Sequence, residues 1–194
     1  MNKSMKLSEH FTLGELCKTK YVTEDGNIPS RVHIENLKRI CDNWLEDLRY
    51  SYNMLYVHSG VRPQSKVVAG VRPQSKVAGD CTLAPDPGAA PELGAAPSSR
   101  KEEPIIINSG YRSPEVNRLA GGAANSNHLS GCAVDIRCAG KEQMIRYASI
   151  LLDIADGSKQ EYDELLLEQH GSVCWLHFAV RPKENRRIIR FLRV

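Results

Sequence analysis

The sequence predicts an α+β fold, in which helices come first and a small antiparallel sheet follows with the helices packed on it. Three observations support this class. An amphipathic segment spans about 30–49, a β-branched run lies at 105–107, and two apolar runs near the end, 164–168 and 175–180, are separated by His170-Gly171. The chain has 194 residues, which is enough for one domain with a hydrophobic core.

The first helices are predicted from capping signals and periodicity. Thr12 and Glu15 have the spacing of a capping box, so a short helix follows Thr12. A longer helix begins at Ser30 and runs to about Arg49. Its apolar residues recur at intervals of three and four, which buries one face. They are Leu37, Ile40, Cys41, Trp44, Leu45 and Leu48.

The second half of the chain alternates short strands and helices. Ser113 followed by Pro114 is typical of a helix start, and this helix ends near Leu119. Residues 133–137 are predicted as a strand and 141–156 as an amphipathic helix. The tail, 186–194, is predicted as a final strand, although arginines recurring every three residues leave a helix open. They are Arg187, Arg190 and Arg193.

A segment at about 58–103 is predicted to be an insertion that interrupts a single domain covering 1–194. An octapeptide at 60–67 recurs unchanged at 70–77, and the residues that follow are rich in Ala, Pro and Gly. Such a composition cannot bury a core. Residues 57–62 also resemble 107–112, by partial duplication or by chance. Deletion of the insertion is predicted to leave metal binding intact.

Composition excludes several classes of function. The net charge of +3, with both signs interspersed, does not indicate a nucleic-acid partner. No apolar run is long enough for a membrane span, and the N-terminus lacks the apolar segment of a secretion signal. The chain is therefore expected to be cytoplasmic as synthesised and monomeric. Its six scattered cysteines are expected to be reduced.

His128, Asp135 and His177 are candidate metal ligands. If Gly131 allows a tight turn into the following strand, His128 and Asp135 can converge, and His177 on another strand completes a triangle. Two imidazoles and a carboxylate suit zinc, and three protein ligands leave one position for water, as in catalytic sites. Taken singly, the three residues also fit a loop histidine, a capping aspartate and a core histidine.

The motifs around these residues resemble a known family. Ser-Gly-Tyr-Arg at 109–112, Ser-x-His-x-x-Gly-x-Ala-x-Asp at 126–135 and Trp-x-His at 175–177 are similar to the zinc D-Ala-D-Ala carboxypeptidase family of metallopeptidases. That family includes phage and bacterial peptidoglycan endopeptidases and has the hedgehog/DD-peptidase fold. The resemblance covers about 7–49 and 103–194, and is nearest to the small phage and prophage branch.

The resemblance implies roles for several residues. His128, Asp135 and His177 would bind Zn²⁺, Arg112 would steady a substrate carbonyl or carboxylate, and Ser126 would bind substrate. Several relatives carry a general-base glutamate where this chain has Cys174, and others a histidine where it has Trp175. In the branch resembled most, a glutamate often ends the preceding strand. Glu168 fits that position, with His170 and Glu164 as lesser candidates.

The predicted function is zinc-dependent cleavage of peptidoglycan stem peptides. D-Ala-D-Ala carboxypeptidase activity is the favoured reaction, and endopeptidase activity is the second choice. A phage-type lysis route would bring such a chain to the cell wall. One alternative is a non-catalytic zinc-binding module of a phage or the cell wall. A hedgehog-type signalling domain is disfavoured because the secretion signal is absent. The basic turn at 181–187 is expected to be solvated, with contact to anionic wall polymer as its alternative.

Overall fold

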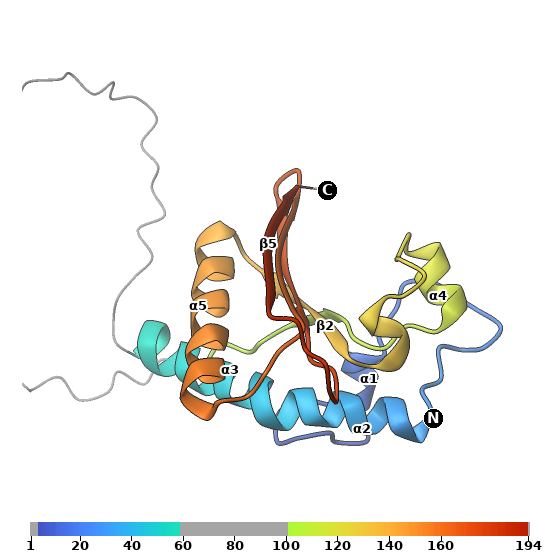
Figure 1. Ribbon diagram of the computed structural model, residues 1–194, viewed down its shortest axis with the longest axis horizontal. Coiled ribbons are helices and arrows are strands. Elements are labelled where there is room, and N and C mark those ends of the chain that lie inside the picture. Colours follow the sequence, from blue (N-terminus) through green and yellow to red (C-terminus); the bar gives the residue numbers. More distant parts are fainter. Residues whose placement is uncertain (1–3, 59–100, 194) are drawn as a thin grey trace, which may run out of the picture.

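The computed structural model describes residues 4–58 and 101–193, and it has the predicted α+β class (Figure 1). The helical elements are α1 (Leu13–Leu16), α2 (Arg31–Ile40), η1 (Cys41–Leu45), α3 (Glu46–Tyr52), η2 (Asn53–His58), α4 (Pro114–Leu119), η3 (Asn127–Ser130) and α5 (Lys141–Ser158). The strands are β1 (Ile107–Ser109), β2 (Ala133–Cys138), β3 (Glu164–His170), β4 (Val173–Ala179) and β5 (Ile188–Arg193).

The sheet is mixed, which corrects the expectation of a purely antiparallel one. Its strand order is β1-β2-β4-β3-β5, and β5 runs parallel to β3 while the other neighbours are antiparallel. Both sides of β4 are already occupied, by β2 and β3, and the chain that leaves β4 adds at the outer edge of β3. Because it reverses direction on the way, it arrives parallel to β3. The tail is therefore a strand, and its helical alternative is wrong.

The long N-terminal helix continues past its predicted end at Arg49. The elements α2, η1, α3 and η2 follow one another without a break as far as His58, and η1 and η2 are π-helical. The predicted apolar face is buried, with Trp44 fully covered and packed against Phe178 at a ring separation of 5.0 Å. The capping box at Thr12 and the Ser113–Pro114 helix start are both confirmed.

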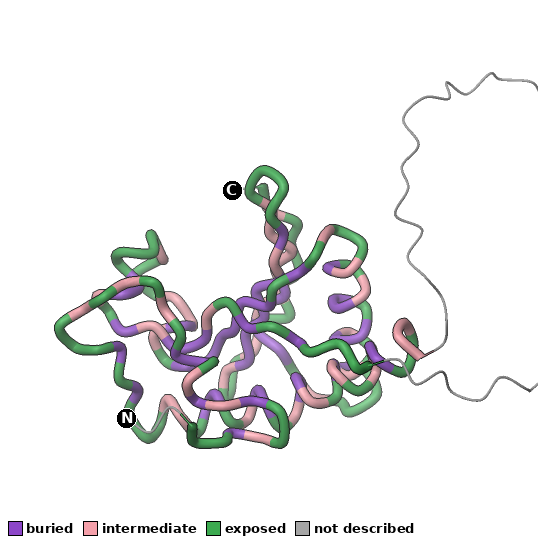
Figure 2. The backbone as a smooth tube through the Cα atoms, turned by 180° about the vertical axis from the view of Figure 1, so that it is seen from behind, coloured by how far each residue is buried: buried purple, intermediate pink, exposed green. Residues whose placement is uncertain are grey.

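The two faces of the sheet have different partners. Side chains alternate along a strand, so Val134 and Ile136 of β2 point to one face and Asp135 to the other. The apolar face packs against the helices, and α5 and α3 lie on that side of the sheet in Figure 1, away from α4. Buried residues gather where the sheet meets the helices (Figure 2). The other face of the central strands is free to carry polar groups.

Strand β1 begins two residues later than predicted. Pairing with β2 decides its position, because Ile107 lies opposite Ile136 and Ser109 opposite Asp135. The register shifts between these two pairs, as at a β-bulge. Bulges re-aim side chains beside functional sites, and this one precedes the Ser-Gly-Tyr-Arg motif.

The predicted insertion falls largely on residues 59–100, which lie outside the described residues. The residues next to the insertion on its two sides contact each other. Asn53 of η2 accepts a hydrogen bond from the Glu103 backbone N–H at 2.7 Å and donates one to the Glu103 carbonyl at 3.0 Å. Arg49 also forms an ion pair with Glu102 at 2.6 Å. Residues 101–103, which the sequence placed in the insertion, therefore contact the folded domain.

Replacing residues 59–100 by about ten flexible Gly and Ser residues is expected to leave zinc stoichiometry unchanged. Residues 102 and 103, which follow the insertion, contact η2, α3 and α5. Neither of them lines the cleft that contains the candidate metal ligands. Metal analysis of the purified protein checks this. Removing 101–103 as well is the control, and it should lower thermal stability because the Asn53–Glu103 bonds are lost. Loss of zinc from the first variant would refute the insertion hypothesis.

The cysteines of residues 4–58 and 101–193 are buried free thiols. In the same part of the chain, no helix combines the length and apolar character that crossing a membrane requires.

Candidate metal centre

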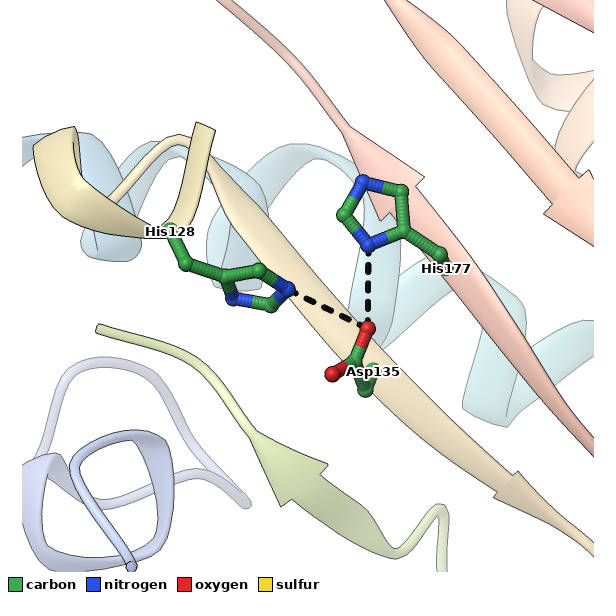
Figure 3. A group of neighbouring side chains, drawn as sticks. All are labelled: His128, Asp135 and His177. Carbon is green, nitrogen blue, oxygen red and sulfur yellow. Dashed lines mark hydrogen bonds and ion pairs between the residues drawn. The ribbon is translucent and has the colours of Figure 1, made fainter. Parts of the chain in front are cut away.

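Three predicted ligands converge on the polar face of the sheet. One oxygen of Asp135, Oδ1, lies 3.2 Å from His128 Nε2 and 2.9 Å from His177 Nδ1 (Figure 3). One donor atom from each of the three residues lies within 4.8 Å of the others, and all three residues are buried. Tetrahedral zinc with bonds of about 2.1 Å places its ligand atoms about 3.4 Å apart. The donor types and their spacing therefore fit zinc.

One hydrogen bond fixes the ring of His128 and another fixes its backbone. Its Nδ1 lies 2.6 Å from the Gly110 carbonyl oxygen, so Nδ1–H donates there and Nε2 is left as the metal-binding nitrogen. The Ser126 hydroxyl caps the η3 turn by accepting the His128 N–H at 3.3 Å. The turn ends at Gly131, whose φ is +69° and whose missing Cβ would meet the His33 carbonyl at 2.6 Å.

The Ser-Gly-Tyr-Arg motif supports the ligands as well as lining the cleft. A Cβ at Gly110 would lie 2.3 Å from the Leu16 carbonyl, so only glycine fits there. The Arg112 side chain donates from Nε to the Ser109 hydroxyl at 2.7 Å and from Nη2 to Asp135 Oδ2. Arg112 therefore engages the oxygen of Asp135 that faces away from the histidines, and this leaves Oδ1 for the metal.

His177 lies opposite both Asp135 of β2 and Leu166 of β3. Its two ring nitrogens face two carboxylates, since Nε2 lies 3.5 Å from Glu164 Oε2. Burial alone would lower the pKa of His177, but hydrogen bonds to Asp135 and Glu164 outweigh it and raise the pKa to about 9. Burial would likewise raise the pKa of Asp135, and the two histidines hold it well below its usual range.

Glu164 and Glu168 lie on the same face of β3 but have opposite electrostatic environments. The hydrogen bond to His177 lowers the pKa of Glu164, so this carboxylate stays ionised. Burial raises the pKa of Glu168, although the nearby charge of His177 opposes that effect. Glu168 pairs across the sheet with Trp175, and both side chains line the cleft. Two carboxyl groups whose pKa values are pushed apart are typical of divided acid–base roles.

The ligands open into a cleft of 850 Å³. Arg112, Ser126, Glu164, Glu168 and Trp175 line it together with the three ligands. The lesser candidate His170 is not brought there, and neither is Cys174, which stands where several relatives carry a glutamate. His170 is exposed at the end of β3. The Cys174 side chain is buried and follows the apolar alternation of Leu176 and Phe178, so it faces the core.

The basic turn 181–187 is largely exposed, as expected, but two of its arginines also contact a buried carboxylate. Arg186 forms hydrogen bonds through Nε and Nη2 to both oxygens of Asp163, at 2.8 and 2.6 Å, and Arg181 Nε lies 3.1 Å from the same carboxylate. Asp163 is fully buried. Sequence reasoning missed this network, and it missed Asn127 as a partner of Asp163 and Glu164. Alternation along β3 places Glu164 and Glu168 on one face, which is the signal that was available.

Zinc affinity is expected to rise with pH, by about tenfold per pH unit below pH 9, and then to level off. Metal must displace the proton that His177 holds up to a pKa of about 9. The same shift stabilises the zinc-free fold fully below pH 6.5, the ordinary pKa of histidine, and this stability is lost as pH rises through 9.

Competition with a chromophoric chelator and thermal unfolding of chelated protein, both between pH 6 and 10, measure these two effects. The variant His170→Gln removes an exposed histidine outside the cleft and should keep both profiles. A pH-independent zinc affinity would contradict the environment described for His177.

Comparison with known proteins adds one finding. Residues 92–156, about a third of the chain, match the sequence family described as Peptidase M15. The matched segment contains Arg112, His128 and Asp135 and ends before the β3–β4 hairpin. No curated protein sequence matches the chain. The match supports a metallopeptidase of the M15 family, whose members depend on zinc.

Proposed function

We propose that this protein is a zinc-dependent peptidase that cleaves peptidoglycan stem peptides. D-Ala-D-Ala carboxypeptidase activity is the favoured reaction, and endopeptidase activity is the second choice. One observation carries the proposal. His128, Asp135 and His177 present three metal-binding atoms at one point in a cleft that also contains a half-buried carboxyl group, Glu168. The Peptidase M15 match over part of the chain supports the same class.

The three ligands leave an open position, and zinc bound there would lower the pKa of water to about 7 and polarise the scissile carbonyl. Glu168 takes a proton from the attacking water and passes it to the leaving amine. Its raised pKa suits this exchange because a general base works best when its pKa lies near the working pH. Trp175 lies opposite Glu168 on the neighbouring strand and lines the same cleft.

Arg112 and Ser126 are proposed to bind substrate. Arg112 uses only part of its donor set on Ser109 and Asp135 and has further N–H groups for a carbonyl or carboxylate oxygen. The cleft also reaches Lys18 and Lys20. Neither ammonium group forms an ion pair with any residue of 4–58 or 101–193. This end of the cleft is therefore positive, which favours stem peptides with free carboxylates.

The test couples zinc stoichiometry to release of D-Ala from a pentapeptide ending in D-Ala-D-Ala. One zinc per chain with chelator-sensitive release is the expected result. One zinc without release from the pentapeptide, but with cleavage of intact peptidoglycan, would support the endopeptidase. Zinc with neither activity would support the non-catalytic zinc-binding module. Absence of zinc would overturn the assignment of His128, Asp135 and His177.

A further inference from the structure

The imidazole of His177 contacts a second carboxylate, Glu164, to which the proposed reaction gives no role. Its Nδ1 faces Asp135 at 2.9 Å, and its Nε2 faces Glu164 Oε2 at 3.5 Å. Glu164 lies on the far side of the ring from the metal-binding nitrogen. A carboxylate in this position fixes the ring of a ligating histidine and raises its basicity.

Glu164 is itself held at both oxygens. Arg186 Nη2 donates to Oε1 at 2.7 Å, and Asn127 Nδ2 donates to Oε2 at 3.1 Å. The carboxylate therefore has little freedom to rotate away from His177. Asn127 directly precedes the ligand His128 in η3, so this contact also links the two histidine ligands.

Arg186 is fixed in turn by the fully buried Asp163. The guanidinium binds both oxygens of Asp163, and the Arg186 backbone N–H donates to the same carboxylate at 3.2 Å. Asn127 donates to Asp163 as well, at 2.8 Å. A two-pronged guanidinium–carboxylate pair is geometrically specific. The turn before β5 therefore places the Arg186 guanidinium next to Glu164, beside the candidate metal ligands.

We infer that Arg186 and Glu164 are positioning residues: Arg186 orients Glu164, and Glu164 orients His177 for metal binding. This inference rests on the proposed zinc site. It assigns to the basic turn a part in building the site. Outer partners of this kind change metal affinity by about 10–100-fold, and a loss of that size is expected here.

The experiment measures zinc affinity of the full chain by competition with a chromophoric chelator. Glu164→Ala and Arg186→Gln should each weaken zinc binding by about 10–100-fold, and Glu164→Gln, which keeps an acceptor, should weaken it less. Arg187→Gln is the matched control, because Arg187 is the next residue and pairs with Asp156 and Glu161, away from the cleft. It should bind zinc as the unmodified protein does.

The double variant Glu164→Ala with Arg186→Gln separates positioning from general destabilisation. If Arg186 acts through Glu164, the double variant loses no more affinity than Glu164→Ala alone. Additive losses, unchanged affinity in both single variants, or an equal loss in Arg187→Gln would overturn the inference while leaving the proposed function standing. Absence of zinc binding by the unmodified protein would instead contradict the proposed function.

Discussion

The variant Asp135→Asn is expected to lose zinc, with an affinity at least about 100-fold lower than that of the unmodified protein. Changes in outer partners alone cost 10–100-fold, and Asp135 supplies the only anionic donor of the cluster. The same change leaves Arg112 partly buried without its carboxylate partner. Removing one member of a buried ion pair costs about 3 kcal/mol, so the zinc-free variant should also be less stable.

Two measurements separate these effects. Chelator competition gives the affinity, and urea unfolding of chelated protein gives the free energy of unfolding without metal. Asp156→Asn is the control, since Asp156 is an exposed residue of α5 that pairs with Arg187. It should change neither quantity by much. Full zinc binding by Asp135→Asn would exclude Asp135 as a ligand.

The variant Glu168→Gln is expected to keep its zinc and lose hydrolysis by about 10²–10⁴-fold, the usual contribution of general acid–base catalysis. Glutamine has nearly the same shape but cannot accept and return a proton. The loss should appear in kcat, with KM little changed, because the proton transfer belongs to the transition state. Stem-peptide hydrolysis and metal content measured on one preparation check both parts.

The matched control for Glu168 is Glu161→Gln. Glu161 is exposed and lies outside the cleft, where it pairs with Arg187 at 3.5 Å. Its substitution should leave hydrolysis unchanged. If Glu168→Gln hydrolyses stem peptides at the normal rate, another group transfers the proton. If Glu168→Gln loses its zinc together with its activity, Glu168 supports the metal centre instead.

Local signals in the sequence predicted the elements whose structure is determined locally. The capping box at Thr12, the Ser113–Pro114 start and the turn at Gly171 each depend on neighbours a few residues away. The convergence of two of the three candidate ligands could also be predicted, because a turn at Gly131 and alternation along β2 bring His128 and Asp135 together. These features need no knowledge of long-range pairing.

Features that depend on pairing between distant segments were not accessible. The place of β5 beside β3 is a pairing between segments distant in sequence, and no local pattern in 188–193 encodes it. The link from Arg186 to Glu164 appears only when β5 is in place. Alternation puts Glu164 and Glu168 on one face. Both lie two residues from Leu166, the partner of His177 in the sheet, so only the orientation of the His177 ring shows that Glu164 meets Nε2.

The three candidate metal ligands come from two separate stretches of chain. The first, from Ser109 to Asp135, supplies two ligands and their supports, and it lies within the segment that matches Peptidase M15. The second, the β3–β4 hairpin, supplies His177 and the proposed proton carrier. In the proposed mechanism, a change at Glu168 alone would leave the matched segment and the three candidate ligands in place while removing the proton carrier. Likeness in the first stretch therefore does not by itself report on the proposed catalysis, which also depends on the residue at position 168.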